Sequence, residues 1–89
     1  MPKVVRVGDK DTDFPPDSMD EGSPNVFTNK ISTARLGDRD NDTPPNSTVT
    51  GSENVFVNKR PITRIGDIDD DYPPDTKIQG SANVFANGK

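Results

Sequence analysis

One six-residue pattern recurs three times in this chain with an unchanged spacing. Gly-Ser-x-Asn-Val-Phe occupies residues 22–27, 51–56 and 80–85, in steps of 29 residues. Two other motifs keep the same step: Arg-x-Gly-Asp begins at residues 6, 35 and 64, and Pro-Pro at residues 15, 44 and 73. Three equal copies without insertions predict one structural unit used three times around an axis. We therefore expect a single domain over residues 1–89 with pseudo-threefold symmetry.

The composition limits the core that such a domain can build. Only 27% of the 89 residues are apolar, there is no Trp, and Gly and Pro number 7 and 9. Typical globular chains are roughly 45–50% apolar, so composition alone favours disorder. The strict period argues against disorder, because a linker has no need of a register. A small unit of this kind gains its stability from neighbouring copies or from a partner.

Charge and residue usage exclude several classes of function. The net charge of −4 and the lack of a basic stripe disfavour a nucleic-acid partner. Without cysteine there is no disulfide framework and no thiolate metal site. No apolar run has the length of a membrane span, and the N-terminus lacks the apolar core of a signal peptide. We expect a protein that is made in a cytoplasm without an export signal of its own.

Each copy reads as a short β-hairpin. Asn tolerates the positive φ that two-residue hairpin turns require, and these turns are predicted at Asn29-Lys30, Asn58-Lys59 and Asn87-Gly88. Return strands are expected over residues 31–36 and 60–65, ending before Gly37 and Gly66, which are predicted bulge or turn residues. Pro-Pro then stiffens the connection to the next copy. Nothing keeps a 3.6-residue period, so the predicted fold class is all-β, without helices.

The third hairpin has no return strand behind it, because the chain ends at Lys89. Residues 3–9 match the return strands in position and type. We expect this N-terminal strand to complete the last hairpin, which would close the ring and remove two exposed strand edges.

The alignment of the copies produces three apolar triplets. Adjacent strand residues point to opposite faces, so the Val and Phe triplets are expected to face different ways. Either one of them fills a small axial core and the other meets a partner, or both are core. The triplets are Val26, Val55 and Val84; Phe27, Phe56 and Phe85; and Val7, Leu36 and Ile65.

The hairpin motif followed by x-x-x-Arg-x-Gly-Asp resembles the PAAR-repeat proteins, the caps of contractile injection machines. The family includes type VI secretion spikes and the small tip proteins of contractile-tailed phages. The likeness covers essentially the whole chain. It implies a small cone of short β-strands whose broad base sits on the blunt end of a homotrimeric β-helical spike, one copy per trimer. Its apex would lead penetration of the target envelope and touch the membrane only transiently.

The chain departs from the family at its signature and at its metal site. Pro-Ala-Ala-Arg survives only in part, at residues 61–64 and 32–35, with Lys-Val-Val-Arg at residues 3–6. Family members hold zinc or iron near the apex with three His and one Cys, and this chain contains neither residue type. That site cannot be carried over, and no cofactor is expected from the resemblance. We also expect no appended effector domain.

Aspartates form a ladder of three Asp-x-Asp-x-Asp segments, which begin at Asp9, Asp38 and Asp67. The spacing opens an EF-hand calcium loop, but Phe14, Thr43 or Tyr72 stands where that loop needs Gly. Two interpretations stay open. Asp13, Asp42 and Asp71, which fall near a family His, would form an axial ring around calcium or magnesium if the loops converge. Alternatively, these carboxylates cap turns and face water.

The arginines of the Arg-x-Gly-Asp motif stand three residues before an aspartate. An ion pair within each motif would fix the turn, whereas exposed pairs contribute only about 0–1 kcal/mol. Recurrence in all three copies favours the structural role for Arg6 with Asp9, Arg35 with Asp38, and Arg64 with Asp67.

The predicted function is structural: a membrane-piercing tip of a contractile injection machine. The expected location is the virion, at the spike tip of the tail baseplate, or the tip of a secretion or injection apparatus. An enzyme is not expected, because catalysis needs different groups in different roles and the copies are nearly identical. The alternative is a small calcium-responsive β-repeat binding module that uses the Asp-x-Asp-x-Asp loops as ligands. A self-associating adhesin is a third reading.

Overall fold

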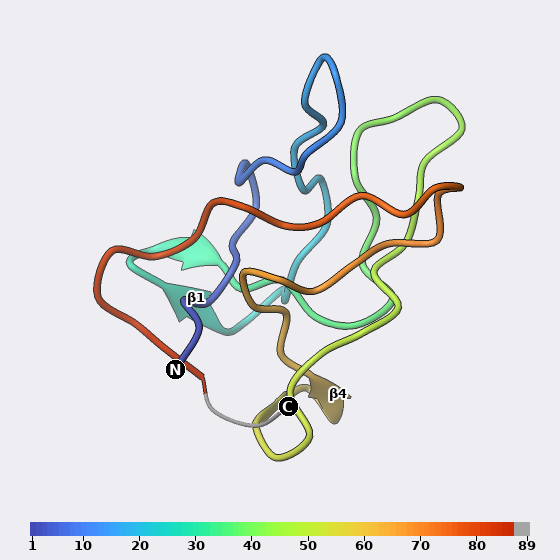
Figure 1. Ribbon diagram of the computed structural model, residues 1–89. Helices are drawn as coiled ribbons and strands as arrows, with labels where there is room; N and C mark the ends of the chain where they lie inside the picture. Colours follow the sequence, from blue (N-terminus) through green and yellow to red (C-terminus); the bar gives the residue numbers. More distant parts are fainter. Residues whose placement is uncertain (87–89) are drawn as a thin grey trace.

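The fold is built from very short β-elements. The computed structural model describes residues 1–86, and within them there are four strands and no helix. β1 (Phe27–Thr28) pairs with β2 (Ile31–Ser32), and β3 (Phe56–Val57) pairs with β4 (Arg60–Pro61), both antiparallel (Figure 1). The prediction of an all-β chain is confirmed.

The two hairpins have the predicted turns. Asn29 and Lys30 have φ angles of 54° and 68°, and Asn58 and Lys59 repeat them at 54° and 67°. Two consecutive positive φ angles define the turn whose twist matches that of paired strands. The registers also agree, since Phe27 faces Ser32 and Phe56 faces Pro61. The turn predicted at Asn87-Gly88 lies outside the described residues.

The N-terminal segment pairs with the third copy. Lys3 and Phe85 form an antiparallel bridge, in the register that Phe27 and Phe56 keep in the other copies. The Val4 N–H donates to the Val84 carbonyl at 2.9 Å, and the Ala86 N–H donates to the Pro2 carbonyl at 3.0 Å. The expected pairing is therefore present, as an isolated bridge rather than as a strand.

The return strands are shorter than predicted, because the backbone soon leaves its own hairpin for another copy. Past the hairpins, bridges join Arg6 to Thr33, Arg35 to Ile62 and Arg64 to Val4. In the middle, three N–H groups donate to carbonyls in a closed circuit, each at 3.0 Å: Val5 to Thr63, Thr63 to Ala34, and Ala34 to Val5. All three of these residues are fully buried. The circuit joins three segments that lie 29 residues apart.

The core is small and is not made of the predicted Val and Phe triplets. It consists of two clusters of buried apolar residues, one of Val4, Val57, Ile62 and Ala86, the other of Val5, Met19 and Ala34. The three Phe side chains are 43–56% exposed, and Val26 and Val84 are 38% and 37% exposed. The residue after each Phe points inward instead, because adjacent strand residues face opposite sides. These buried residues are Thr28, Val57 and Ala86. Only Val55 and Ile65 of the three apolar triplets pack against the clusters.

The Gly-Ser-x-Asn motif is a joint between copies. A Cβ on Gly80 would lie 2.7 Å from the Val4 carbonyl oxygen, so the close backbone approach there needs glycine. The buried Ser23 hydroxyl accepts the N–H groups of Asn25 and Val26 and donates at 2.6 Å to the side-chain oxygen of Asn58, the turn residue of the second hairpin. The motif thus recurs because it binds the hairpin turn of another copy and holds it in place.

Candidate functional site

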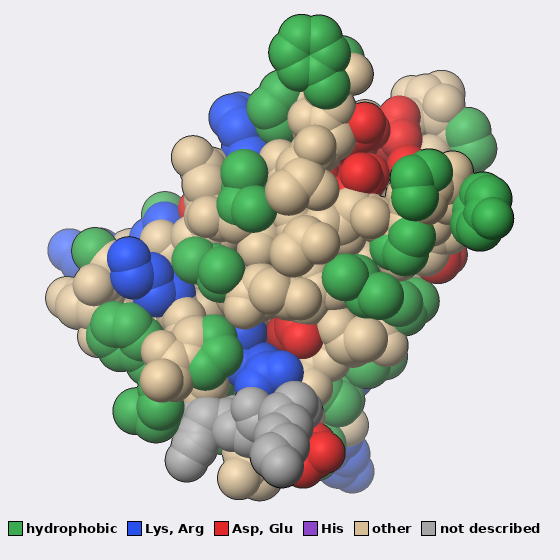
Figure 2. All heavy atoms as spheres, viewed as in Figure 1, with side chains coloured by type: hydrophobic (Ala, Val, Ile, Leu, Met, Phe, Trp, Pro, Cys, Tyr) green, Lys and Arg blue, Asp and Glu red, His purple; other side chains and the backbone are tan. Residues whose placement is uncertain are grey.

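The three aspartate-rich loops gather at one side of the molecule. In Figure 1 they lie toward the upper right, away from the hairpins and the chain ends. Figure 2 shows acidic side chains clustered between protruding loops at that place. Phe14 and Tyr72 are both 95% exposed, so apolar side chains project from two of the loops.

The middle aspartate of each segment forms an inner layer. Asp11, Asp40 and Asp69 are 1–2% exposed. In each, Oδ1 accepts the backbone N–H groups of the residues two and six positions later, at 3.0–3.1 Å. These bonds fold the loop around the carboxylate. The other oxygen, Oδ2, is buried and has no hydrogen-bond partner in any of the three.

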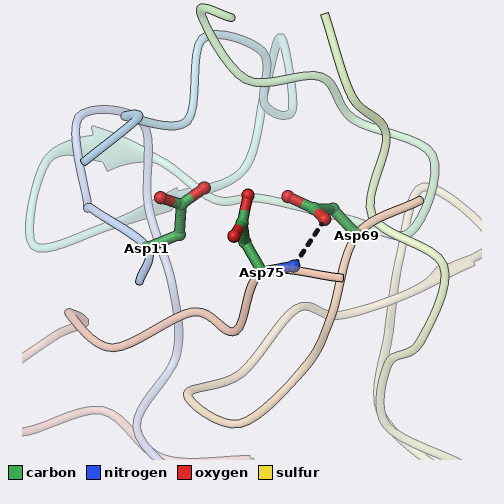
Figure 3. A group of neighbouring side chains, drawn as sticks. All are labelled: Asp11, Asp69 and Asp75. Atoms are coloured by element: carbon green, nitrogen blue, oxygen red, sulfur yellow. Dashed lines mark hydrogen bonds between the residues drawn. The ribbon is translucent and has the colours of Figure 1, made fainter. Parts of the chain in front are cut away.

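The residue after Pro-Pro adds further carboxylates to the cluster. Asp17 and Asp75 occupy this position in the first and third copies, and Asn46 in the second. One oxygen each of Asp11, Asp69 and Asp75 lies within 4.8 Å of the others, and Figure 3 shows the three carboxylates facing one another. Asp11, Asp17 and Asp40 form a second such group.

The predicted ring of Asp13, Asp42 and Asp71 does not form as one group among the described residues. Asp13 joins Asp42 beside Asp17, and it joins Asp71 beside Asp75. Each of the three also accepts the N–H of the following residue at 2.8 Å, so the turn-capping role is present as well. In the second copy Asn46 stands where the other copies have a carboxylate, and its side-chain amide donates to Asp42 Oδ2 at 3.2 Å.

Sequence reasoning missed the inner layer and the residues that follow Pro-Pro. A signal for the latter exists, since Pro-Pro-Asp, Pro-Pro-Asn and Pro-Pro-Asp keep the 29-residue step at residues 15–17, 44–46 and 73–75. It also missed Lys77, which interrupts the series Met19, Thr48 and Lys77 with a charge.

Lys77 places an ammonium group inside the acidic cluster. Its side chain is 2% exposed, and Nζ lies 3.6 Å from Asp11 Oδ2 and 3.5 Å from Asp69 Oδ2. A buried ammonium is stable only when it is paired, and here two buried carboxylates are its partners. Lys77 is therefore a cation that the chain itself supplies to the cluster.

The remaining negative charge shows in the pKa values of the carboxyl groups. Burial raises the pKa of Asp17 to about 7, with contributions from a hydrogen bond to Asp13 and from the charges of Asp42, Asp11 and Asp40. Burial also raises the pKa of Asp75 to about 6, helped first by the charge of Asp69. The pKa of Asp40 is raised by burial too. A cluster of buried carboxyl groups with raised pKa values retains protons or attracts cations.

The three Arg-Asp pairs stand at the start of the aspartate segments and fix turns. Arg35 donates from Nε and Nη2 to the two oxygens of Asp38, both at 2.9 Å, and its backbone N–H donates to Asp38 as well. Arg6 with Asp9 and Arg64 with Asp67 make the same contacts. Each pair encloses a glycine with φ of 92–97°, at Gly8, Gly37 and Gly66.

A second exposed feature is apolar. Phe27, Phe56 and Phe85 are half-exposed and stand at equal sequence steps in the hairpin region. Buried aromatic side chains contribute strongly to protein interfaces, so an exposed set of this kind is suited to contact another protein.

No protein-family model matches the chain, and a search of the curated proteins finds no significant match. Residues 1–86 contain no helix long and apolar enough to cross a membrane.

Proposed function

We propose that this chain is a structural, non-enzymatic tip that caps the distal end of a homotrimeric β-helical spike. The spike belongs to a contractile injection machine, a phage tail baseplate or a related apparatus, and one copy of the chain sits on each trimer. In this proposal the three 29-residue copies stand around a pseudo-threefold axis and form a squat cone. The principal extents of 27 × 24 × 23 Å would suit a short cap.

The observation that carries the proposal is the hydrogen-bond circuit of Val5, Ala34 and Thr63. Each of the three donates to one of the others and accepts from the third. A rotation by one third of a turn would therefore exchange equivalent partners. A single chain with such internal equivalence presents three similar surfaces at once, which is what a trimeric partner requires.

The exposed Phe residues are the proposed docking surface for the spike. They recur once per copy and are 43–56% exposed. Docking would bury three aromatic side chains in equivalent positions of the trimer, and central aromatic anchors dominate interface energies. The acidic loops would then face away from the spike, and piercing would be mechanical, driven by contraction of the sheath.

Co-purification with a trimeric spike tests the proposal. The full chain is co-expressed with a homotrimeric β-helical spike protein, and the mass of the complex is measured by light scattering. We expect one copy of this chain per three spike chains. Phe56→Asp should abolish the complex, whereas Phe14→Asp, on an acidic loop, should leave it intact. A different stoichiometry, or equal loss with both variants, would contradict the proposal.

The second candidate is a calcium-responsive β-repeat module, and the acidic groups at the loops favour it. In that case the isolated chain would be unfolded in a chelator and would fold on addition of calcium. The spike tip instead folds without calcium and binds its trimer whether or not calcium is present. Circular dichroism in chelator separates the two.

A further inference from the structure

The acidic cluster contains three junctions between copies. Each consists of the inner-layer aspartate and the residue after Pro-Pro from one copy, together with the inner-layer aspartate of another copy. The first junction is Asp11, Asp17 and Asp40, and the third is Asp69, Asp75 and Asp11. The 29-residue step assigns Asp40, Asn46 and Asp69 to the second, where the Asn46 N–H donates to Asp40.

The three junctions reduce their negative charge in different ways. In the third, the Lys77 ammonium lies between Asp11 and Asp69. In the second, Asn46 replaces a carboxylate with a neutral amide. The first junction has three carboxylates. Lys77 is ion-paired with its Asp11 and its charge acts to lower the pKa of its Asp40, but no Lys or Arg of the described residues is ion-paired with its Asp17 or Asp40. Of the three junctions, it is the one with neither an amide in place of a carboxylate nor an ammonium paired with both of its inner-layer aspartates.

A buried oxygen without a partner points to a ligand at the first junction. Asp40 is 2% exposed, and its Oδ1 already accepts two backbone N–H groups. Its Oδ2 is buried and accepts no hydrogen bond, and the same holds for Oδ2 of Asp17. A buried carboxylate oxygen without a partner is costly, so this geometry is stable only with a proton or a cation beside it.

We propose that the first junction binds a divalent calcium ion through Asp11, Asp17 and Asp40. The donors are all carboxylate oxygens, which hard cations prefer. Asp13 and Asp42 form a further group with Asp17, so two more carboxylates lie beside the site. Calcium accepts six to eight oxygen ligands in flexible geometry, and it therefore suits this set better than magnesium, which demands an octahedron.

The calcium ion has a defined structural effect. Asp11, Asp13 and Asp17 belong to the first copy, and Asp40 and Asp42 to the second, so the ion joins two copies. Lys77 joins the third copy to the first in the same manner. The ion binds the folded chain and not the unfolded one, so it stabilises the fold without being required for it.

Binding of calcium to the full chain tests the proposal. Protein freed of metal with a chelator and then desalted is titrated with calcium chloride in a calorimeter, and thermal unfolding is followed with and without the ion. We expect one calcium ion per chain and a higher unfolding temperature. Magnesium should bind more weakly. No heat and no change of unfolding temperature at millimolar calcium, with a folded protein, would overturn the proposal.

Asp17→Asn gives the first junction the composition of the second, and Asp75→Asn is its matched control at the third. Calcium affinity depends on the number of charged ligands, so Asp17→Asn should weaken binding at least about tenfold and Asp75→Asn much less. Asp17→Asn removes repulsion and should fold in chelator. An equal effect of the two variants would mean diffuse attraction by the loops and would overturn the site.

Lys77→Met extends the test, because Met19 occupies the equivalent position of the first copy. The variant removes the ammonium from the third junction, where Asp11, Asp69 and Asp75 remain. We expect it to bind a second calcium ion. If the folded variant still binds only one calcium ion per chain, Lys77 does not occupy the place of a metal ion in the third junction.

Discussion

At the hairpin end the contacts of the described residues repeat from copy to copy, whereas at the acidic end they differ. Each Arg-Asp pair repeats the same bidentate geometry, and buried Ser23 and Ser81 donate to turn asparagines of other copies. At the acidic end the equivalents diverge, with Met19, Thr48 and Lys77 in one layer and Asp17, Asn46 and Asp75 in another. Contacts that set the backbone path must be identical in every copy. Side chains in the acidic interior can differ, because the negative charge can be reduced in a different way at each junction.

The largest expected effect tests the shared backbone contacts. Deleting residues 1–8 removes the Val5 member of the central circuit and the pairing with the third copy, and should abolish cooperative unfolding. A circular permutant with residues 3–8 joined after residue 89 keeps these segments in the register of the other hairpins and should restore it. Urea unfolding followed by circular dichroism is the measurement. A deletion variant as stable as the intact chain would refute closure.

Breaking one Arg-Asp pair should have the next largest effect. Arg35→Ala leaves the Asp38 carboxylate buried at 2% exposure, with the half-exposed Arg60 as its remaining ion-pair partner among residues 1–86, and should destabilise the fold by about 3 kcal/mol. Arg39→Ala breaks an exposed pair with Glu21, which solvent screens, and should leave the unfolding midpoint almost unchanged. The midpoints of urea unfolding report both. Similar costs would show that burial does not distinguish these pairs.

The acidic end should give the protein an unusual dependence on pH. The raised pKa values of Asp17 and Asp75 mean that the folded chain holds protons that the unfolded chain releases. In chelator, stability should therefore fall as pH rises from about 5 through 7, since the unfolded state binds fewer protons in that range. Unfolding midpoints between pH 5 and 8 measure this. The Asp17→Asn, Asp75→Asn double variant should flatten the slope, and a rise in stability with pH would contradict the assignment.

The smallest effect is expected at the exposed aromatic side chains. Phe56 is 55% exposed, so Phe56→Ser should change the free energy of unfolding by no more than about 0.5–1 kcal/mol. Val57→Ser, one residue further on, affects a buried side chain and should cost clearly more. Thermal unfolding of both variants compares outer and inner positions of one strand. Equal losses would place Phe56 in the core after all.

The backbone of the hairpin end could be predicted from sequence because its signals are local. Asn29-Lys30 and Asn58-Lys59 identify the turns, and the match between residues 3–9 and the return strands identifies the partner of the third copy. The strand lengths could not be predicted, since the departure of the chain after Ser32 depends on contacts with another copy. The core residues could not be predicted either, because the alternation of side chains along a strand does not show which of its two faces is buried.

The acidic site could be predicted only in part. The repeated aspartates indicate a cluster, but periodicity directs attention to equivalent residues such as Asp13, Asp42 and Asp71. The charge of the site depends instead on the positions at which the three copies carry different residues, at Asn46 and Lys77. Which carboxylates meet Lys77 is a matter of distances across three loops, and no local pattern contains that information.

The circuit of Val5, Ala34 and Thr63 has a consequence for how the gene can change. Tandem duplications are prone to gain or lose a unit by unequal recombination. Here every unit gives one N–H and takes one N–H, and the loop is complete with three. A fourth unit would have to open this loop, and removal of one unit would break two of its three hydrogen bonds, so that the remaining buried groups would have to pair anew. A chain that gained or lost a unit would therefore have to rearrange the buried backbone pairing at the centre of the fold.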